Sequence, residues 1–116
     1  MKRFVLASLL ILLCFTICIV ENIYIHLVFN EIQQNLKIAK SDITYTTVVK
    51  NKWNDNRMWL SFFINHSSLD EISEEIDKLN KTAYLNEYEY QNTIRNINFL
   101  LQSIKETESI NFDNMF

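Results

Sequence analysis

Glycine and proline are both absent from this chain of 116 residues. Average usage would place about eight glycines and six prolines in a chain of this length. Glycine supplies the positive-φ positions of hairpin turns and phosphate-binding loops, and proline marks loops and strand edges. Their absence disfavours β-sheet architectures and removes glycine-rich nucleotide motifs from consideration. The composition therefore predicts an all-α fold.

Cysteine is scarce, and positive charge is in the minority. The two cysteines, Cys14 and Cys18, lie inside an apolar run, so no disulfide is available to the rest of the chain. Lys2 and Arg3 are two of the eleven basic residues, so nine basic residues face fourteen acidic ones after that run. A nucleic-acid partner is not expected, because the phosphate backbone requires clustered Lys and Arg.

The apolar run, residues 4–20, predicts a transmembrane helix in contact with the lipid bilayer. A helix of this length rises about 26 Å, close to the hydrocarbon thickness of about 30 Å. The stretch from Thr16 to Tyr24 lacks the small-residue pattern of a signal cleavage site, so a retained signal anchor is favoured over a cleaved signal peptide. Lys2 and Arg3 before the run, with Glu21 after it, place the N-terminus in the cytoplasm. We expect residues 1–21 to form a transmembrane signal anchor and residues 22–116 an extracytoplasmic helical bundle domain.

Beyond Glu21, apolar residues recur at spacings typical of helices that bury one face. They form four groups: Ile25, Phe29, Ile32, Leu36 and Ala39; Tyr45, Val49, Trp53, Leu60 and Ile64; Leu69, Ile72, Ile76, Leu79 and Ala83; and Tyr90, Ile94, Ile97, Leu101 and Ile104. The breaks between the groups are short, at Lys40–Asp42, Asn65–Ser68 and Leu85–Asn86. This pattern predicts an antiparallel bundle of about four helices whose first helix continues from the transmembrane segment.

Polar residues at the breaks match helix N-caps. Ser41 or Asp42 is expected to cap the second helix, Ser68 with Glu71 the third, and Asn86 with Glu89 the fourth. With helices that alternate in direction, the turn at His66 and the C-terminal tail both lie near the bilayer. We expect Phe112, Met115 and Phe116 of that tail to touch lipid or a membrane partner, or else to fold back and close that end of the bundle.

The most distinctive phrase of the chain runs from Trp53 to Asp70 and has the pattern W-x5-W-L-x-F-F-I-N-H-S-x-L-D. It resembles an uncharacterised bacterial family of single-span membrane proteins, domain of unknown function number 4363. The residues that carry the resemblance are Trp53, Arg57, Leu60, Phe63, Ile64, His66, Leu69 and Asp70. The chain ends in N-M-F where the family is similar to N-I-F. The resemblance implies a membrane anchor and a helical C-terminal half, and it implies no chemistry.

His66 is the best candidate for a chemical site, because Asp70 follows four residues later and Ser67 and Ser68 are adjacent. A His and a carboxylate can bind a metal or act as an acid–base pair, yet a structural zinc site needs about four ligands. The other histidine, His26, lies in the first helix. The alternative is a turn histidine that hydrogen-bonds a helix end or Asp70. No catalytic residue, cofactor ligand or metal ligand is assigned, and we do not expect an enzyme.

Trp59 lies off the buried stripe of the second helix. With Tyr45 and Phe62 it can form an exposed aromatic patch for a partner or for lipid headgroups, or it can complete a wide core. The predicted function is that of an extracytoplasmic interaction module or accessory subunit, with an integral membrane protein as partner. The alternatives are a ligand or metal sensor at the His66 end and, less favoured, a hydrolase.

Overall fold

The computed structural model describes the backbone of residues 2–115 and the side chains of residues 2–107. Four helices make up this part of the chain: α1 (Lys2–Ala39), α2 (Tyr45–Leu60), α3 (His66–Thr82) and α4 (Glu87–Met115). No strand occurs within the described backbone. The predicted all-α bundle of four helices, with a long apolar helix at the N-terminus, is confirmed.

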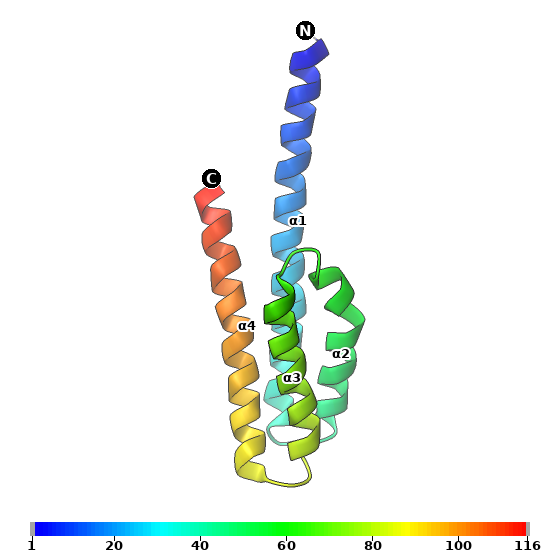
Figure 1. The fold of residues 1–116 in the computed structure, drawn as a ribbon, viewed down its shortest axis with the longest axis vertical. Helices are drawn as coiled ribbons and strands as arrows, with labels where there is room; N and C mark the ends of the chain where they lie inside the picture. The colour runs from blue at the N-terminus through cyan, green and yellow to red at the C-terminus, as the bar shows by residue number, and fades with distance from the viewer. Residues whose placement is uncertain (1, 116) are drawn as a thin grey trace.

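The helices alternate in direction and form a closed ring (Figure 1). α1 packs against α2 and α4, and α3 packs against the same two helices from the opposite corner. The α1–α2 and α3–α4 turns lie at one end of the bundle. The α2–α3 turn lies at the other end, from which α1 extends (Figure 1). α4 also runs beyond that turn, alongside α1. We call the end with the α2–α3 turn the upper end.

The core consists of the predicted apolar stripes together with Val28. All five positions of the first stripe, from Ile25 to Ala39, are fully buried. Each large aliphatic or aromatic side chain that leaves water in this way contributes about 1.5–3 kcal/mol. The stripes thin out at their ends, where Tyr45, Ala83 and Ile104 are only partly buried against the core. Ile64 is buried as predicted, but from the α2–α3 turn, because α2 ends at Leu60.

The turns need no glycine. Within residues 2–115 no residue has a positive φ. The C-caps of α2 and α3, Ser61 and Ala83, both keep right-handed helical dihedrals. Hydrogen bonds to the third residue back tighten all three helix ends: Ser41 N to Ile38 O, Phe62 N to Trp59 O and Leu85 N to Thr82 O. Such bonds satisfy carbonyls that a glycine-based cap would otherwise bind.

Two predicted caps are wrong. The α3 cap is Asn65, whose backbone is extended and whose side chain accepts a hydrogen bond from Ser68 N at 2.8 Å. Asn caps as well as Ser, and the earlier start places Ser68 inside the first turn. The residue at the N-cap of α2 is Thr44. Asp42 instead stabilises the preceding turn, because its carboxylate accepts bonds from Thr44 N at 3.1 Å and from the Thr44 hydroxyl at 2.6 Å.

The opposite end of the bundle, which we call the lower end, joins α4 to the end of α1. Asn86 caps α4 as predicted, since its side chain accepts bonds from the backbone N–H groups of residues 88 and 89, at 3.0 and 3.3 Å. The Tyr90 hydroxyl donates to the carbonyl of Ala39, and Gln91 Nε2 donates to the carbonyl of Lys40 at 3.1 Å. These two bonds occupy carbonyls that α1 leaves unpaired at its C-terminus.

Burial, followed by the negative charge of Asp42, raises the pKa of Tyr90 above its usual value of 10.0. The folded state therefore favours the neutral phenol. The stability that this preference contributes is present below the unfolded pKa, near 10.0, and is lost as the pH rises through the higher folded pKa.

Tyr90→Phe is expected to destabilise the bundle by about 1 kcal/mol at neutral pH, because the Ala39 carbonyl loses its donor. Above pH 10.0 this difference should shrink, since only the wild type then has a buried phenol to ionise. Urea unfolding of the full chain in detergent micelles, followed by circular dichroism, measures both effects. Tyr88→Phe, at an exposed position of the same helix, is the matched control. If the difference in unfolding free energy between wild type and Tyr90→Phe stays constant across this pH range, the pKa of Tyr90 is not raised by folding.

Candidate functional site

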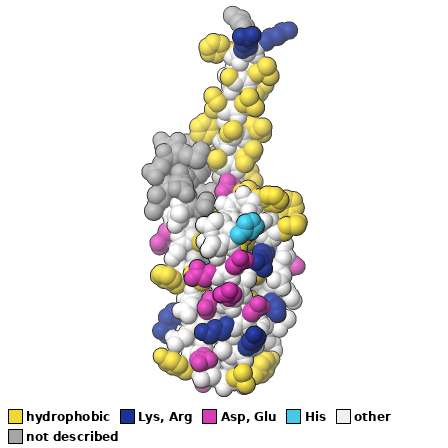
Figure 2. Space-filling model, in the orientation of Figure 1, with side chains coloured by type: hydrophobic (Ala, Val, Ile, Leu, Met, Phe, Trp, Pro, Cys, Tyr) yellow, Lys and Arg dark blue, Asp and Glu magenta, His cyan; other side chains and the backbone are white. Residues whose placement is uncertain are grey.

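Residues 2–24 contribute no buried side chain to the core, which begins at Ile25. α1 is long and apolar enough to cross a membrane, and its most apolar stretch has no residue buried inside the protein. This exposure distinguishes it from the core helix of a soluble protein, whereas a signal sequence near the N-terminus also meets this criterion of length and composition. Figure 2 shows hydrophobic side chains covering the projecting part of α1, while charged side chains of both signs cover the bundle.

The α2–α3 turn lies against α1 just past this apolar stretch. The Tyr24 hydroxyl donates to Asn56 Oδ1 at 2.8 Å. Its ring meets the Phe63 ring edge-on, with centroids 6.3 Å apart. Further down, Lys52 and Glu31 form an ion pair at 2.7 Å. The upper end of α2 is thus held at the height of Tyr24, three residues after Glu21.

Trp59 is exposed and does not complete the core. It retains 56% of its accessible surface, and Phe62 beside it retains 70%. Their ring centroids lie 6.0 Å apart. Leu60 takes the buried position, so its neighbour Trp59 is turned away by the helical rotation of about 100° per residue. We call the exposed set Met58, Trp59 and Phe62 the aromatic corner.

Of the two alternatives for Trp59, the structure shows the exposed one, with Phe62 beside it and Tyr45 apart from both. Tyr45 is the first residue of α2, whereas Trp59 is in its last turn. The two lie about 21 Å apart along the helix axis.

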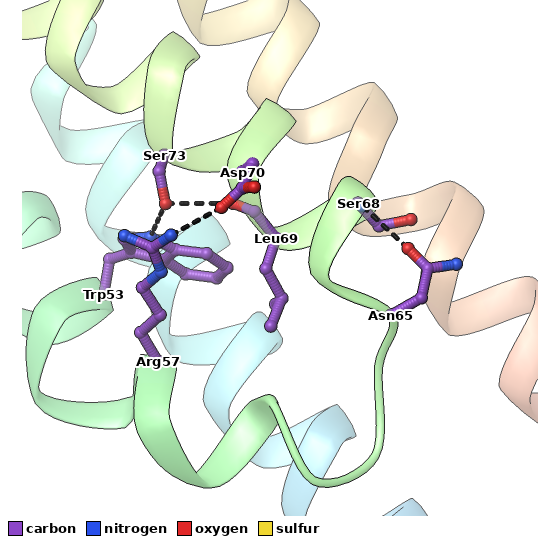
Figure 3. A network of polar contacts seen from close by, with 7 residues as sticks. All are labelled: Trp53, Arg57, Asn65, Ser68, Leu69, Asp70 and Ser73. Atoms are coloured by element: carbon purple, nitrogen blue, oxygen red, sulfur yellow. Dashed lines mark hydrogen bonds and ion pairs between the residues drawn. The ribbon is translucent and has the colours of Figure 1, made fainter.

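Trp53, Arg57 and Asp70 of the distinctive phrase join α2 to α3 (Figure 3). Trp53 is 1% exposed, and its Nε1 donates to Ser73 Oγ at 2.8 Å. Ser73 Oγ donates in turn to the Leu69 carbonyl at 2.9 Å. Arg57 and Asp70 form an ion pair at 2.6 Å. Sequence reasoning missed Ser73, although its position three residues after Asp70 places both on the face of α3 that meets α2.

His66 is the exposed first residue of α3, and the partner of Asp70 is Arg57. Of the two partners considered for His66, a helix end or Asp70, the second is engaged in an ion pair between α2 and α3. Within the described residues, no group of three or more His, Cys, Asp and Glu side chains is placed to hold a metal ion. His26 lies partly buried on α1. The structure thus brings no ligand set together around His66.

A groove of about 680 Å³ lies at the same end, between the α2–α3 turn, the start of α3 and α4. Its apolar lining comes from Phe63, Ile64, Phe99, Leu100 and Ile104. Phe99 is 71% exposed at the rim. One sequence signal pointed to the groove: Phe99 is an aromatic residue between the buried positions Ile97 and Leu101.

The tail singled out from the sequence comprises Phe112, Met115 and Phe116. Phe116 lies outside the described residues, as do the side chains of Phe112 and Met115. The backbone of α4 reaches Met115 and so carries the tail past the α2–α3 turn (Figure 1). Contact of the tail with lipid or a partner remains a hypothesis.

Together these features define a class: a small antiparallel four-helix bundle whose first helix projects as an exposed apolar segment. Residues 19–115, most of the chain, match the family described as Domain of unknown function (DUF4363), and the chain belongs to this family. The resemblance noted in the phrase from Trp53 to Asp70 is thereby confirmed at the level of the family. No curated protein and no solved structure matches the chain.

The two tryptophans should differ sharply in their effect on stability. Trp53→Ala is expected to cost about 3–5 kcal/mol, because it empties a buried site. Trp59→Ala should change stability by no more than about 0.5 kcal/mol, because the side chain is exposed. Urea unfolding of both full-length variants in detergent micelles measures the contrast. Equal losses would show that Trp59 is covered within the folded protein.

Proposed function

We propose that this protein is a membrane-anchored helical module on the outer face of a bacterial cytoplasmic membrane, and that it serves there as an accessory subunit of an integral membrane protein complex. The observation that carries the proposal is the continuity of α1, which runs as one helix of 38 residues from the exposed apolar segment into the core. Such a helix is about 57 Å long, enough for a membrane crossing and the full height of the bundle.

The proposed orientation follows from charge. Lys2 and Arg3 precede the apolar segment, and Glu21 follows it. Basic residues stay preferentially on the cytoplasmic side of a membrane, so the bundle is on the other side. The absence of a small-residue cleavage pattern between Thr16 and Tyr24 supports an anchor that is kept rather than removed.

The pairing of polar side chains in the phrase from Trp53 to Asp70 supports a non-enzymatic role. Trp53 and Ser73 bond to each other, and Asp70 is paired with Arg57. These side chains hold α2 against α3, so they are not poised as an acid–base pair or as a nucleophile with its base. The groove at the upper end, with Phe99 at its rim, is the surface that suits an apolar segment of a membrane partner.

Sidedness can be tested with a single cysteine, because the two natural ones lie in the apolar segment. In a chain carrying Cys14→Ser and Cys18→Ser, Leu85→Cys adds a thiol at a turn residue that is 83% exposed. Intact cells should be labelled at this site by a membrane-impermeant maleimide. A cysteine placed ahead of Lys2, the matched control, should react only after the membrane is permeabilised. The opposite pattern would reverse the proposed orientation.

The accessory role predicts a partner that copurifies with the full-length protein. After crosslinking in membranes and extraction in mild detergent, we expect one integral membrane protein in stoichiometric amount. Phe99→Ser should lower its recovery several-fold, because Phe99 projects at the groove, whereas Leu85→Ser at the far end should not. The absence of any such protein would contradict the accessory role. A retained small molecule in its place would favour the sensor alternative.

A further inference from the structure

A charge-free band surrounds part of the upper end of the bundle. Residues 22–30 of α1 contain no Asp, Glu, Lys or Arg, and neither do residues 58–69, which include the α2–α3 turn. The two segments lie against each other, because Tyr24 contacts Phe63 and bonds to Asn56. Two stretches that are far apart in the sequence therefore combine into one uncharged surface.

The height of this band matches the lipid headgroup layer. Tyr24 is three residues past Glu21, or about 4.5 Å along the helix axis. The headgroup layer on each face of a bilayer is about 5–8 Å thick. When residues 4–20 span the hydrocarbon, the α2–α3 turn therefore lies within that layer. The apolar outer face of α1 also continues through this height, since Ile23 and Leu27 are exposed.

The aromatic corner is the part of the band that projects from the bundle. Met58, Trp59 and Phe62 are all exposed, although they are large and apolar or aromatic. Tryptophan is enriched at membrane–water interfaces, where its apolar ring and its polar N–H are both satisfied. The next charges below the corner, on Arg57 and Asp70, are paired with each other.

The surface is one-sided. α4 packs against α1 and α3, so it lies diagonally across the bundle from α2. It carries Lys105, which bonds to Asn30 at the lower edge of the band, and Glu106 beside it. Charged side chains favour water over the bilayer interior, so the α2 side is the one suited to lie against lipid.

From this arrangement we propose that Met58, Trp59 and Phe62 insert into the lipid headgroup layer and hold the α2 side of the bundle against the bilayer. The occupant of this surface is lipid, because the band is continuous with the exposed apolar face of α1 and lies at headgroup height. The inference rests on the proposed membrane placement of residues 4–20.

Tryptophan fluorescence of the full-length protein tests the contact. The protein is reconstituted in vesicles of phosphatidylcholine and phosphatidylglycerol, with the phosphatidylcholine brominated either high or low on its acyl chains. The signal of Trp59 is the difference between the wild type and Trp59→Phe, which leaves the buried Trp53 as a constant background. The matched control is Tyr88→Trp in the Trp59→Phe chain, which places an exposed tryptophan on α4 near the lower end.

We expect lipid brominated high on its chains to quench Trp59 more strongly than lipid brominated low, and not to quench the tryptophan at position 88. Aqueous iodide should quench Trp59 several-fold less than the control tryptophan. If the protein floats with the vesicles while iodide reaches Trp59 freely, the contact does not exist, although the membrane anchor stands. Protection from iodide without quenching by lipid would mean that protein covers the corner, and would also overturn the proposal. If the protein does not float, the anchor and the contact both fail.

Discussion

The burial of one face of α1, from Ile25 to Ala39, is the constraint on which the rest of the structure depends. α2 and α4 pack on this stripe directly, and α3 closes the core from the opposite corner. The same helix continues into the exposed apolar segment with no proline or glycine to bend it. Because sharp helix kinks need such a residue or an inserted group, the packing of α1 also fixes the direction in which the apolar segment leaves the bundle.

The phrase from Trp53 to Asp70 has two physical roles that fall on opposite sides of α2. Its inward residues, Trp53 among them, join α2 to α3 through packing, a short chain of hydrogen bonds and an ion pair. Its outward residues form the aromatic corner, which adds nothing to the core. An exposed ion pair contributes at most about 1 kcal/mol, so burial of Trp53 is the larger part of this junction. The phrase in this chain can therefore reflect architecture and surface contact without implying catalysis.

The upper end of the bundle is where the proposed functions converge. The apolar segment, the aromatic corner and the groove beside Phe99 all lie there, whereas the lower end is formed by turns and helix caps. An accessory subunit needs this arrangement, because a partner in the membrane can reach only the end that faces the bilayer. Most acidic residues of α3, such as Glu71 and Glu74, are exposed on the flank of the bundle.

The sequence alone determined the helix number, the core stripes and the apolar segment, since each depends on local periodicity or length. It misplaced the cap of α3, because Asn65 and Ser68 are both good capping residues and the helix begins early enough for Asn65 to take this role. It considered Asp70 as one of two possible partners of His66, whereas the fold pairs Asp70 with Arg57 from another helix. It also left Trp59 undecided between core and surface. Tertiary structure decided these points. Ion pairs between helices and the width of a buried face depend on which helices become neighbours. The spacing of residues within any one helix does not contain that information.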